Sequence, residues 1–129
     1  IPIYNHHETI RSTVETLVQF NLPLVIVDDG SDSQTKVCLT GLQKDYPQLI
    51  LLTMQQNSGK GAVVIAGMLK AWELGFTHAL QVDADGQHNL LDVPALFEQS
   101  ALCPEALISG QPVYDHSIPK SRKIGRQIT

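Results

Sequence analysis

The fold is decided by the stretch LVIVDDGSDS at residues 24–33. Its four leading residues are all apolar, which is typical of a strand that is buried on both faces of a parallel sheet. The run stops at Asp28-Asp29-Gly30-Ser31, and Asp32 or Ser33 can then cap a helix that reaches about Asp45 before Pro47. The stretch therefore predicts a strand, a turn and a helix in direct succession.

The same alternation extends in both directions from this stretch. The expected strands are residues 1–4, 24–27, 49–54, 79–82 and 106–109, and the expected helices are 8–20, 33–45, 60–74 and 92–100. Gly75 stands where it can terminate the third helix. Alternating strands and helices predict an α/β fold with a mainly parallel sheet covered by helices.

Composition indicates a globular domain. The 129 residues are 43% hydrophobic and 17% charged, and no apolar run is long enough to cross a membrane. A net charge of −4 argues against a general nucleic-acid binder, although Lys120, Arg122, Lys123 and Arg126 cluster near the end. Two cysteines, Cys38 and Cys103, have no metal or redox spacing, so we expect buried free thiols and a reducing, cytoplasmic location.

Polar residues follow four of the expected strands. They are Tyr4-Asn5, Asp28-Asp29, Asn57 and the pair Asp83/Asp85. In open parallel sheets, ligands bind beyond the carboxyl ends of the strands. We therefore expect the chemistry of this protein to lie along that rim.

The most informative of these positions lies in HALQVDADGQH, residues 78–88. Two carboxylates at the end of an apolar run are costly unless a cation or hydrogen-bond donors meet them. Asp83 and Asp85 offer hard oxygen ligands to a divalent ion, Gly86 lets the chain turn, and Gln87 adds an oxygen. An ordinary acidic surface turn is the competing interpretation. We expect His88 to form hydrogen bonds at the rim rather than to bind metal.

Each of the weaker motifs has both a functional interpretation and one that involves no function. Asp28-Asp29 can read a base or a ribose, or can simply form a turn. The segment from Asn57 to Gly61 lacks the Walker spacing, so Lys60 is as well explained by solvent exposure as by a phosphate. His6-His7-Glu8 is unfavourable for zinc because adjacent side chains rarely point at one ion. Arg122 and Arg126, at helical spacing, can grip a phosphate or form an exposed basic turn.

Taken together, these motifs resemble family 2 glycosyltransferases, which have the Rossmann-like, three-layer α/β/α GT-A fold. The match runs in the family's order through Pro2–Asn5, Asp28–Ser31, Asn57–Gly61 and Asp83–His88, the third and fourth being the glycine-rich loop and the DXD motif. Gly-Gln-His after the paired aspartates is most similar to the branch that makes polyprenyl-phosphate sugars.

The resemblance implies a binding site for a nucleotide-diphosphate sugar. It assigns the nucleoside and its diphosphate to Pro2, Tyr4, Glu8, Asp28, Asp29, Gly59, Lys60 and Asp83, and it assigns Mg²⁺ or Mn²⁺ to Asp83, Asp85 and Gln87. The ion would neutralise charge on the departing nucleoside diphosphate. Arg122 and Arg126 would hold the phosphate of the acceptor.

The resemblance also implies what lies outside this sequence. We expect residues 1–129 to be a single, incomplete donor-binding domain with a clipped first strand, and residues 110–129 to begin the acceptor side. The base of an inverting reaction is expected beyond residue 129, so the fragment should transfer little or no sugar alone. Where the lipid-linked branch carries Gly-Ser-Arg, the chain reads Ser109-Gly110-Gln111, which leaves a lipid phosphate or a saccharide open as acceptor. A membrane-associated parent would work at the cytoplasmic face.

Two other classes compete. A signalling receiver domain also binds Mg²⁺ through acidic strand ends, but it places its acidic pair after the first strand, whereas a strand and a helix precede Asp28-Asp29 here. A nucleotidyltransferase of similar fold would carry a glycine-rich, basic signature near its first strand, and none is present.

Overall fold

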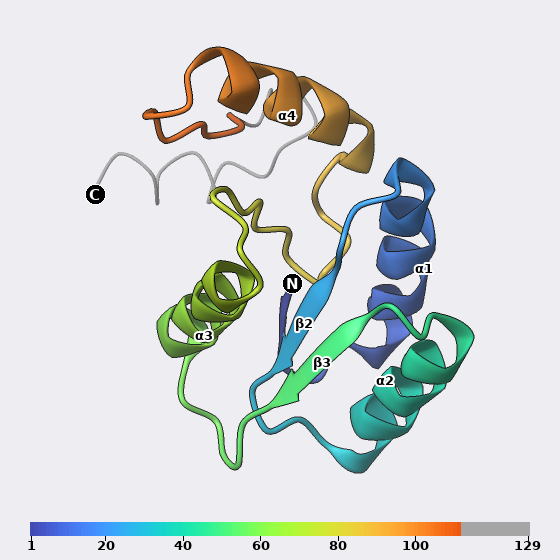
Figure 1. Cartoon of the computed structure of the whole chain (residues 1–129). Helices are drawn as coiled ribbons and strands as arrows, with labels where there is room; N and C mark the ends of the chain where they lie inside the picture. Colours follow the sequence, from blue (N-terminus) through green and yellow to red (C-terminus); the bar gives the residue numbers. More distant parts are fainter. Residues whose placement is uncertain (112–129) are drawn as a thin grey trace, which may run out of the picture. The chain divides into compact units, whose positions relative to one another are not determined.

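The computed structural model of the chain describes residues 1–111 (Figure 1). Packing divides the chain into two compact units, Ile1–Ala95 and Leu96–Thr129. The first unit contains the sheet and every candidate site residue except Arg122 and Arg126, which lie outside the described residues. That residues 1–129 form one domain stays a prediction.

The first unit is built on a parallel sheet whose strands end at one level. Its strands are β1 (Pro2–Ile3), β2 (Val25–Asp28) and β3 (Ile50–Thr53), in the order β1-β2-β3. Asp28 is in register with Ile3 on one side and with Thr53 on the other. The loops that follow the three strands therefore leave the sheet side by side.

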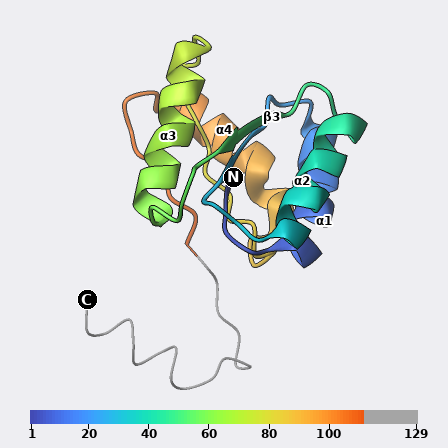
Figure 2. The ribbon, with the colours of Figure 1, turned by 90° about the horizontal axis from the view of Figure 1, so that it is seen from below.

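Helices cover both faces of this sheet (Figure 2). Helices α1 (His7–Leu17) and α2 (Ser33–Asp45) pack together on one face, and α3 (Lys60–Glu73) packs against β1 and β2 on the other. Short 3-10 turns follow α1 at Val18–Phe20 and precede α4 (Val93–Leu102) at Leu90–Asp92. The three-layer, Rossmann-like α/β/α arrangement predicted from the sequence is confirmed.

Two predicted helix ends, the start of α2 and the end of α3, are confirmed as well. The helix predicted at 8–20 gives way to a 3-10 turn after Leu17, and the one predicted at 92–100 runs from Val93 to Leu102. The N–H of Thr35 donates to the Asp32 carboxylate at 2.8 Å, which caps α2. Gly75 has φ +86°, and its N–H donates to the carbonyl oxygen of Trp72 while Phe76 N–H donates to that of Ala71. This left-handed residue ends α3, as a C-terminal glycine does.

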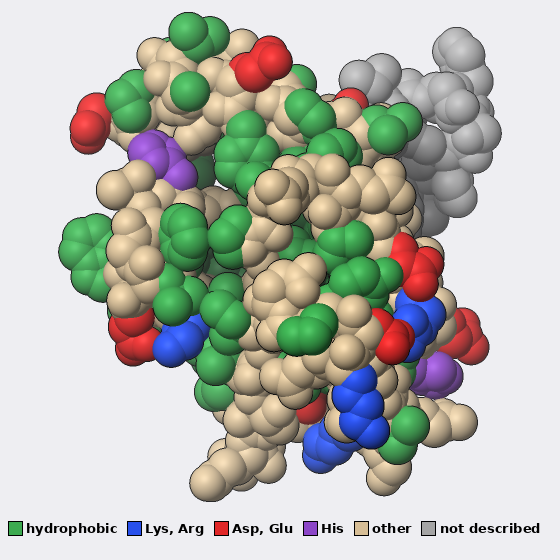
Figure 3. Space-filling model, turned by 45° about the vertical axis from the view of Figure 1, so that its right-hand side comes forward, with side chains coloured by type: hydrophobic (Ala, Val, Ile, Leu, Met, Phe, Trp, Pro, Cys, Tyr) green, Lys and Arg blue, Asp and Glu red, His purple; other side chains and the backbone are tan. Residues whose placement is uncertain are grey.

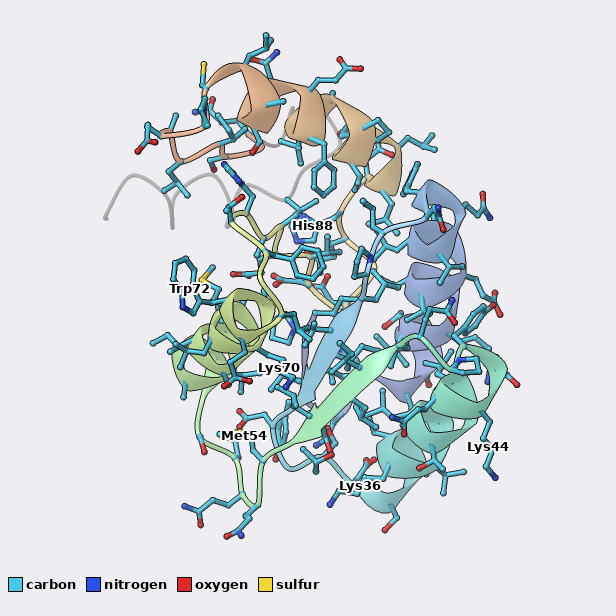
Figure 4. The ribbon with its side chains drawn as sticks, viewed as in Figure 1. Lys36, Lys44, Met54, Lys70, Trp72 and His88 are labelled. Carbon is cyan, nitrogen blue, oxygen red and sulfur yellow. The ribbon has the colours of Figure 1, made fainter. Side chains whose placement is uncertain are left out.

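The two faces of the sheet differ in how much of each helix they bury. The buried core lies largely between the sheet and the α1–α2 pair, and its largest fully buried apolar side chains are Ile10, Val14, Ile26, Val27, Leu39, Leu42 and Val63. Helix α3 contributes only Val63, although its sequence is apolar. Ile65, Met68, Leu69 and Trp72 of α3 are exposed, and Figure 4 shows Trp72 on the side of α3 away from β2.

Two predicted strands are wrong. Residues 79–82 join no strand of the sheet; β1, at its edge, has only two residues, and Pro2 has no N–H to donate to a further strand. Residues 106–109 also form no strand, and Leu107 is 96% exposed. An apolar run becomes a strand only where another backbone supplies the hydrogen bonds.

The expectation of buried thiols is also wrong. Both cysteines are free, but Cys38 is only half-buried and Cys103 is exposed.

Candidate functional site

The site begins where the turn after β1 meets the turn after β2. Asn5 adopts a left-handed conformation, with φ +58°, and its N–H donates to Ser31 Oγ at 3.1 Å. Its own side-chain oxygen accepts from Asp32 N–H at 2.8 Å. Asparagine tolerates this conformation better than most residues. These two bonds hold the turns in a defined relative position.

The buried side chain of Asp28 stabilises the turn after β2. Its side chain is fully buried, and Oδ1 accepts from Ser31 N–H at 2.9 Å, whereas Oδ2 has no hydrogen-bond partner. It is absent from the lining of the cavity described below. Asp28 thus lies in the interior of the turn.

Gly30 brings the turn after β2 against the loop after β3. It has φ +72°, and a Cβ at this position would lie 2.9 Å from the carbonyl carbon of Gln56 and 3.0 Å from the N of Asn57. Those are backbone atoms, so they cannot move aside cheaply. Only glycine fits this close approach.

Asp29 fixes the loop that leads into α3. Its Oδ1 accepts from Ser58 N–H at 2.6 Å, and its Oδ2 accepts from Gly59 N–H at 2.9 Å. Asp29 is 4% exposed. A carboxylate oxygen can accept more than one hydrogen bond, so both oxygens keep capacity for a ligand. Asp29 therefore organises the loop and still faces the cavity.

The polar ends of three side chains lie around the carboxylate of Asp83. Lys60 Nζ lies 2.6 Å from Oδ2, Gln81 Nε2 donates to Oδ1 at 3.0 Å, and His88 Nε2 lies 3.6 Å from Oδ2. Partial burial acts to raise the pKa of Asp83, but the hydrogen bonds from Lys60 and Gln81 outweigh it and hold that pKa below its usual value. Asp83 is therefore a carboxylate at neutral pH.

The turn after Asp83 is tied to α1. Thr9 Oγ1 donates to the carbonyl oxygen of Ala84, and Gly86 has φ +72° close to the Thr9 methyl group. Asp85 Oδ1 accepts from Gln87 N–H at 3.0 Å. The hydrogen bond from Thr9 therefore holds the turn after Asp83 against α1.

These loops enclose an open cavity of about 300 Å³. Its lining comprises Pro2, Ile3, Tyr4, His6, Asp29, Asn57, Gly59, Lys60, Val63, Asp83, Ala84 and Asp85. Seven predicted site residues are thereby brought together: Pro2, Tyr4, Asp29, Gly59, Lys60, Asp83 and Asp85. Glu8 and Gln87 are exposed outside this lining, and Asp28 is buried below it.

Some residues of the site were not assigned a role from the sequence. His6 and Asn57 line the cavity, and Gln81 and Thr9 support the acidic loop. A signal for Gln81 was available, because residues two apart on the strand predicted at 79–82 and its continuation would point to the same side. Nothing near Thr9 in the sequence indicates that it reaches Ala84, 75 residues away.

The cavity presents carboxylate oxygens and one lysine. Among residues 1–111, no cluster of three or more His, Cys, Asp or Glu side chains could hold a metal ion. The carboxylates that line the cavity are those of Asp29, Asp83 and Asp85. On the face shown in Figure 3, Lys and Arg side chains lie beside Asp and Glu side chains and form no continuous basic field. None of the helices in the described part of the chain has the length and apolar character needed to cross a bilayer.

Comparison with known proteins gives one family. The model of "Glycosyl transferase family 2" matches residues 1–123. A UDP-N-acetylglucosamine–dolichyl-phosphate N-acetylglucosaminyltransferase of Methanococcus voltae is 29% identical, with 97% of this chain and 57% of that protein covered.

Two further relatives carry related names. The dolichyl-phosphate beta-glucosyltransferase of Saccharomyces cerevisiae is 31% identical over 76% of this chain and 32% of its own length. The undecaprenyl-phosphate 4-deoxy-4-formamido-L-arabinose transferase of Pseudomonas fluorescens is 28% identical over 79% of this chain and 31% of its own. The chain thus spans little more than half the length of these relatives at most. No solved structure gives a significant match.

Proposed function

We propose a donor-binding role for this chain, which belongs to glycosyltransferase family 2. Its first unit binds the nucleoside diphosphate of a sugar donor through a divalent cation. The observation that carries this proposal is the lining of one cavity by Asp29, Gly59, Lys60, Asp83 and Asp85. Two of these carboxylates are acidic ligands for a hard cation, and Lys60 together with the N-terminus of α3 suits an anion.

The carboxylates of the cavity are suitable ligands for Mg²⁺ or Mn²⁺. Asp83 and Asp85 would hold the ion, and the amide oxygen of Gln87, which lies outside the lining, would become a third donor only by turning toward it. When bound, the ion would neutralise negative charge on the leaving diphosphate. Asp83 is charged at neutral pH, so no deprotonation has to precede binding.

The remaining residues of the cavity suit the rest of a nucleotide. Pro2 and Tyr4 present apolar and aromatic surface at one part of the lining, and Tyr4 is 47% exposed. Asp29 retains free lone pairs toward the cavity and would accept from a base N–H or a ribose hydroxyl. Glu8 and Asp28, which lie outside the lining, would act on the nucleoside only indirectly.

For the whole protein we propose sugar transfer to a polyprenyl or dolichyl phosphate. The support is the names of the relatives, each of which specifies a lipid phosphate. Arg122 and Arg126 would hold that phosphate. Since the chain covers at most 57% of the length of these relatives, residues 1–129 alone should bind donor but transfer little sugar.

A thermal-shift panel tests the donor site. UDP, GDP, CDP and dTDP are each added to the chain with and without Mn²⁺. One diphosphate should raise the melting temperature by several degrees in the presence of Mn²⁺ only, since ligand at 100 times its Kd stabilises by about 2.7 kcal/mol. Asp85→Ala should abolish that shift.

The matched control is Asp45→Ala, which removes an exposed aspartate that pairs with Arg11 and does not line the cavity. This variant should keep the full metal-dependent shift. If none of the four diphosphates changes the melting temperature of the wild-type chain with Mn²⁺, the proposed donor site is wrong.

A further inference from the structure

Lys60 is placed so that its charge faces the acidic loop. It is the first residue of α3, and its Nζ lies 2.6 Å from Asp83 Oδ2 although its side chain is 61% exposed. The backbone before it is held in place, because Gly59 N–H donates to Asp29 at 2.9 Å. The pair thus joins two loops of the cavity that are 23 residues apart in the sequence.

A lysine at this position works against the helix itself. The N-terminus of a helix carries partial positive charge, which favours anions and disfavours cations in the first turn. Helix α3 has no acidic residue in its first turn to compensate. A nearby anion offsets this unfavourable position, and in this structure that anion is Asp83.

We propose that Lys60 acts as a stand-in cation at Asp83, so that a divalent ion binds weakly by itself and tightly only together with a nucleoside diphosphate. This inference rests on the proposed donor site. It adds a role for Lys60 in coupling the two ligands, beyond contact with the diphosphate.

The reason is a competition between positive charges. A divalent ion that arrives alone must displace the Lys60 ammonium from Asp83 and would leave it unpaired beside a second cation. A diphosphate supplies a new anionic partner for Lys60 within the same cavity, next to Gly59 and the N-terminus of α3. The ion can then bind Asp83 without leaving the Lys60 ammonium unpaired.

Such a competition is a coupling free energy and acts in both directions. If the diphosphate raises the affinity for the metal, the metal raises the affinity for the diphosphate by the same factor. Removing the charge of Lys60 should therefore have opposite effects on the two ligands: the metal alone binds better, and the diphosphate binds less well.

Titration of Mn²⁺ followed by the paramagnetic resonance signal of the free ion tests this proposal, and needs no activity. The signal is recorded with and without saturating UDP for wild type, Lys60→Met, Lys60→Arg and Lys70→Met. The same titration without protein measures the Mn²⁺ that UDP binds by itself, and this amount is subtracted. The measured quantity is the coupling factor, the ratio of the Mn²⁺ dissociation constants without and with UDP. If another diphosphate is the one that stabilises the chain, it replaces UDP.

We expect Lys60→Met to bind Mn²⁺ alone about threefold tighter than wild type, which is the order expected for an exposed ion pair. Its coupling factor should fall about fivefold, the lower end of common coupling energies. Lys60→Arg keeps the positive charge and should keep the coupling. Lys70 lies on the same helix (Figure 4), pairs with Glu73 at 3.1 Å and does not line the cavity, so Lys70→Met should match wild type.

The outcomes separate this inference from the function on which it rests. Wild type that binds Mn²⁺ with UDP, and a Lys60→Met variant with the same coupling factor, would overturn the role of Lys60 and leave the donor site standing. Wild type that fails to bind Mn²⁺ even with the diphosphates would overturn both.

Discussion

The chain has two acidic loops, and their carboxylates are held in different ways. In the loop of residues 28–32, every aspartate accepts from backbone N–H groups: Asp28 from Ser31, Asp29 from Ser58 and Gly59, and Asp32 from Thr35. In the loop of residues 83–85, Asp83 accepts instead from the ends of Lys60 and Gln81, and Asp85 accepts from the single N–H of Gln87.

This difference distinguishes carboxylates that stabilise the fold from carboxylates that can bind a ligand. A backbone N–H that loses its acceptor inside the protein costs free energy, so the carboxylates of the first loop are committed to the fold. A lysine or glutamine side chain can rotate away and find water or another ligand. Asp83 can therefore exchange its donors for a cation, which the carboxylates of the first loop cannot do without local unfolding.

The largest effect should come from Gly30→Ala in the first loop. The new Cβ would meet the backbone of Gln56 and Asn57 at about 3 Å and would sit on a residue with φ +72°. Left-handed strain and the clash together should lower the free energy of unfolding by about 3 kcal/mol. Urea unfolding followed by circular dichroism measures this.

The control for that prediction is Gly61→Ala, because a Cβ at Gly61 meets no atom within 4 Å. It should be neutral or stabilising, since Gly61 lies within α3 and alanine favours helices. Equal stability of Gly30→Ala and wild type would show that the two loops do not need their close approach.

A smaller effect is expected from Asp29→Ala, and it should differ sharply from Asp83→Ala. Loss of Asp29 leaves the N–H groups of Ser58 and Gly59 without their acceptor, which should cost about 2 kcal/mol. Loss of the more exposed Asp83 frees only Lys60 and Gln81, so the cost should stay within about 0.5 kcal/mol.

The same urea unfolding measurement compares the two variants directly. Metal binding should rank the two variants in the opposite order, because Asp83→Ala should lose the metal-dependent thermal shift completely. Should Asp83→Ala destabilise the chain as much as Asp29→Ala does, the division between a structural and a binding loop would be wrong.

The smallest effect concerns Asp32 and depends on pH. The Thr35 N–H bond lowers the pKa of Asp32 below its ordinary value of 3.8. A carboxylate with a lowered pKa in the folded state contributes stability that is present above the ordinary value and is lost as pH falls through the lower one. Asp32→Ala should therefore melt below wild type at pH 7, and the gap should narrow toward pH 2.

Differential scanning calorimetry across this range gives the two melting temperatures. Thr40→Ala is a suitable control, because its hydroxyl donates to the Lys36 carbonyl in the same helix and carries no titrating group. Its difference from wild type should not change with pH. A gap for Asp32→Ala that is also constant with pH would show that the charge of Asp32 does not contribute to the cap.

Much of the first unit was predictable because its signals are local. The apolar run before Asp28, the cap at Asp32 and the terminating glycine at position 75 each act over a few residues, and all three appear in the structure. The predicted strand at residues 79–82 failed because its partner, and not its own sequence, decides whether a strand forms.

The candidate site was predictable in its residue types but not in their roles. The order of the motifs places Asp29, Lys60, Asp83 and Asp85 at one rim, and all four line one cavity. The sequence could not separate Asp28 from Asp29, since two adjacent aspartates look alike until one is buried and the other faces the cavity.

The class of fold, the start of α2, the end of α3 and the family could all be deduced from the sequence alone, because periodicity, caps and motifs are properties of short segments. Only the tertiary structure decided that Asp28 is committed to its turn, that Asp29 holds the loop before α3, and that Lys60 faces Asp83. Those contacts join residues up to 30 positions apart. The packing of the loops decides which carboxylates accept hydrogen bonds from the backbone and which accept them from side chains. No local sequence pattern predicts that packing.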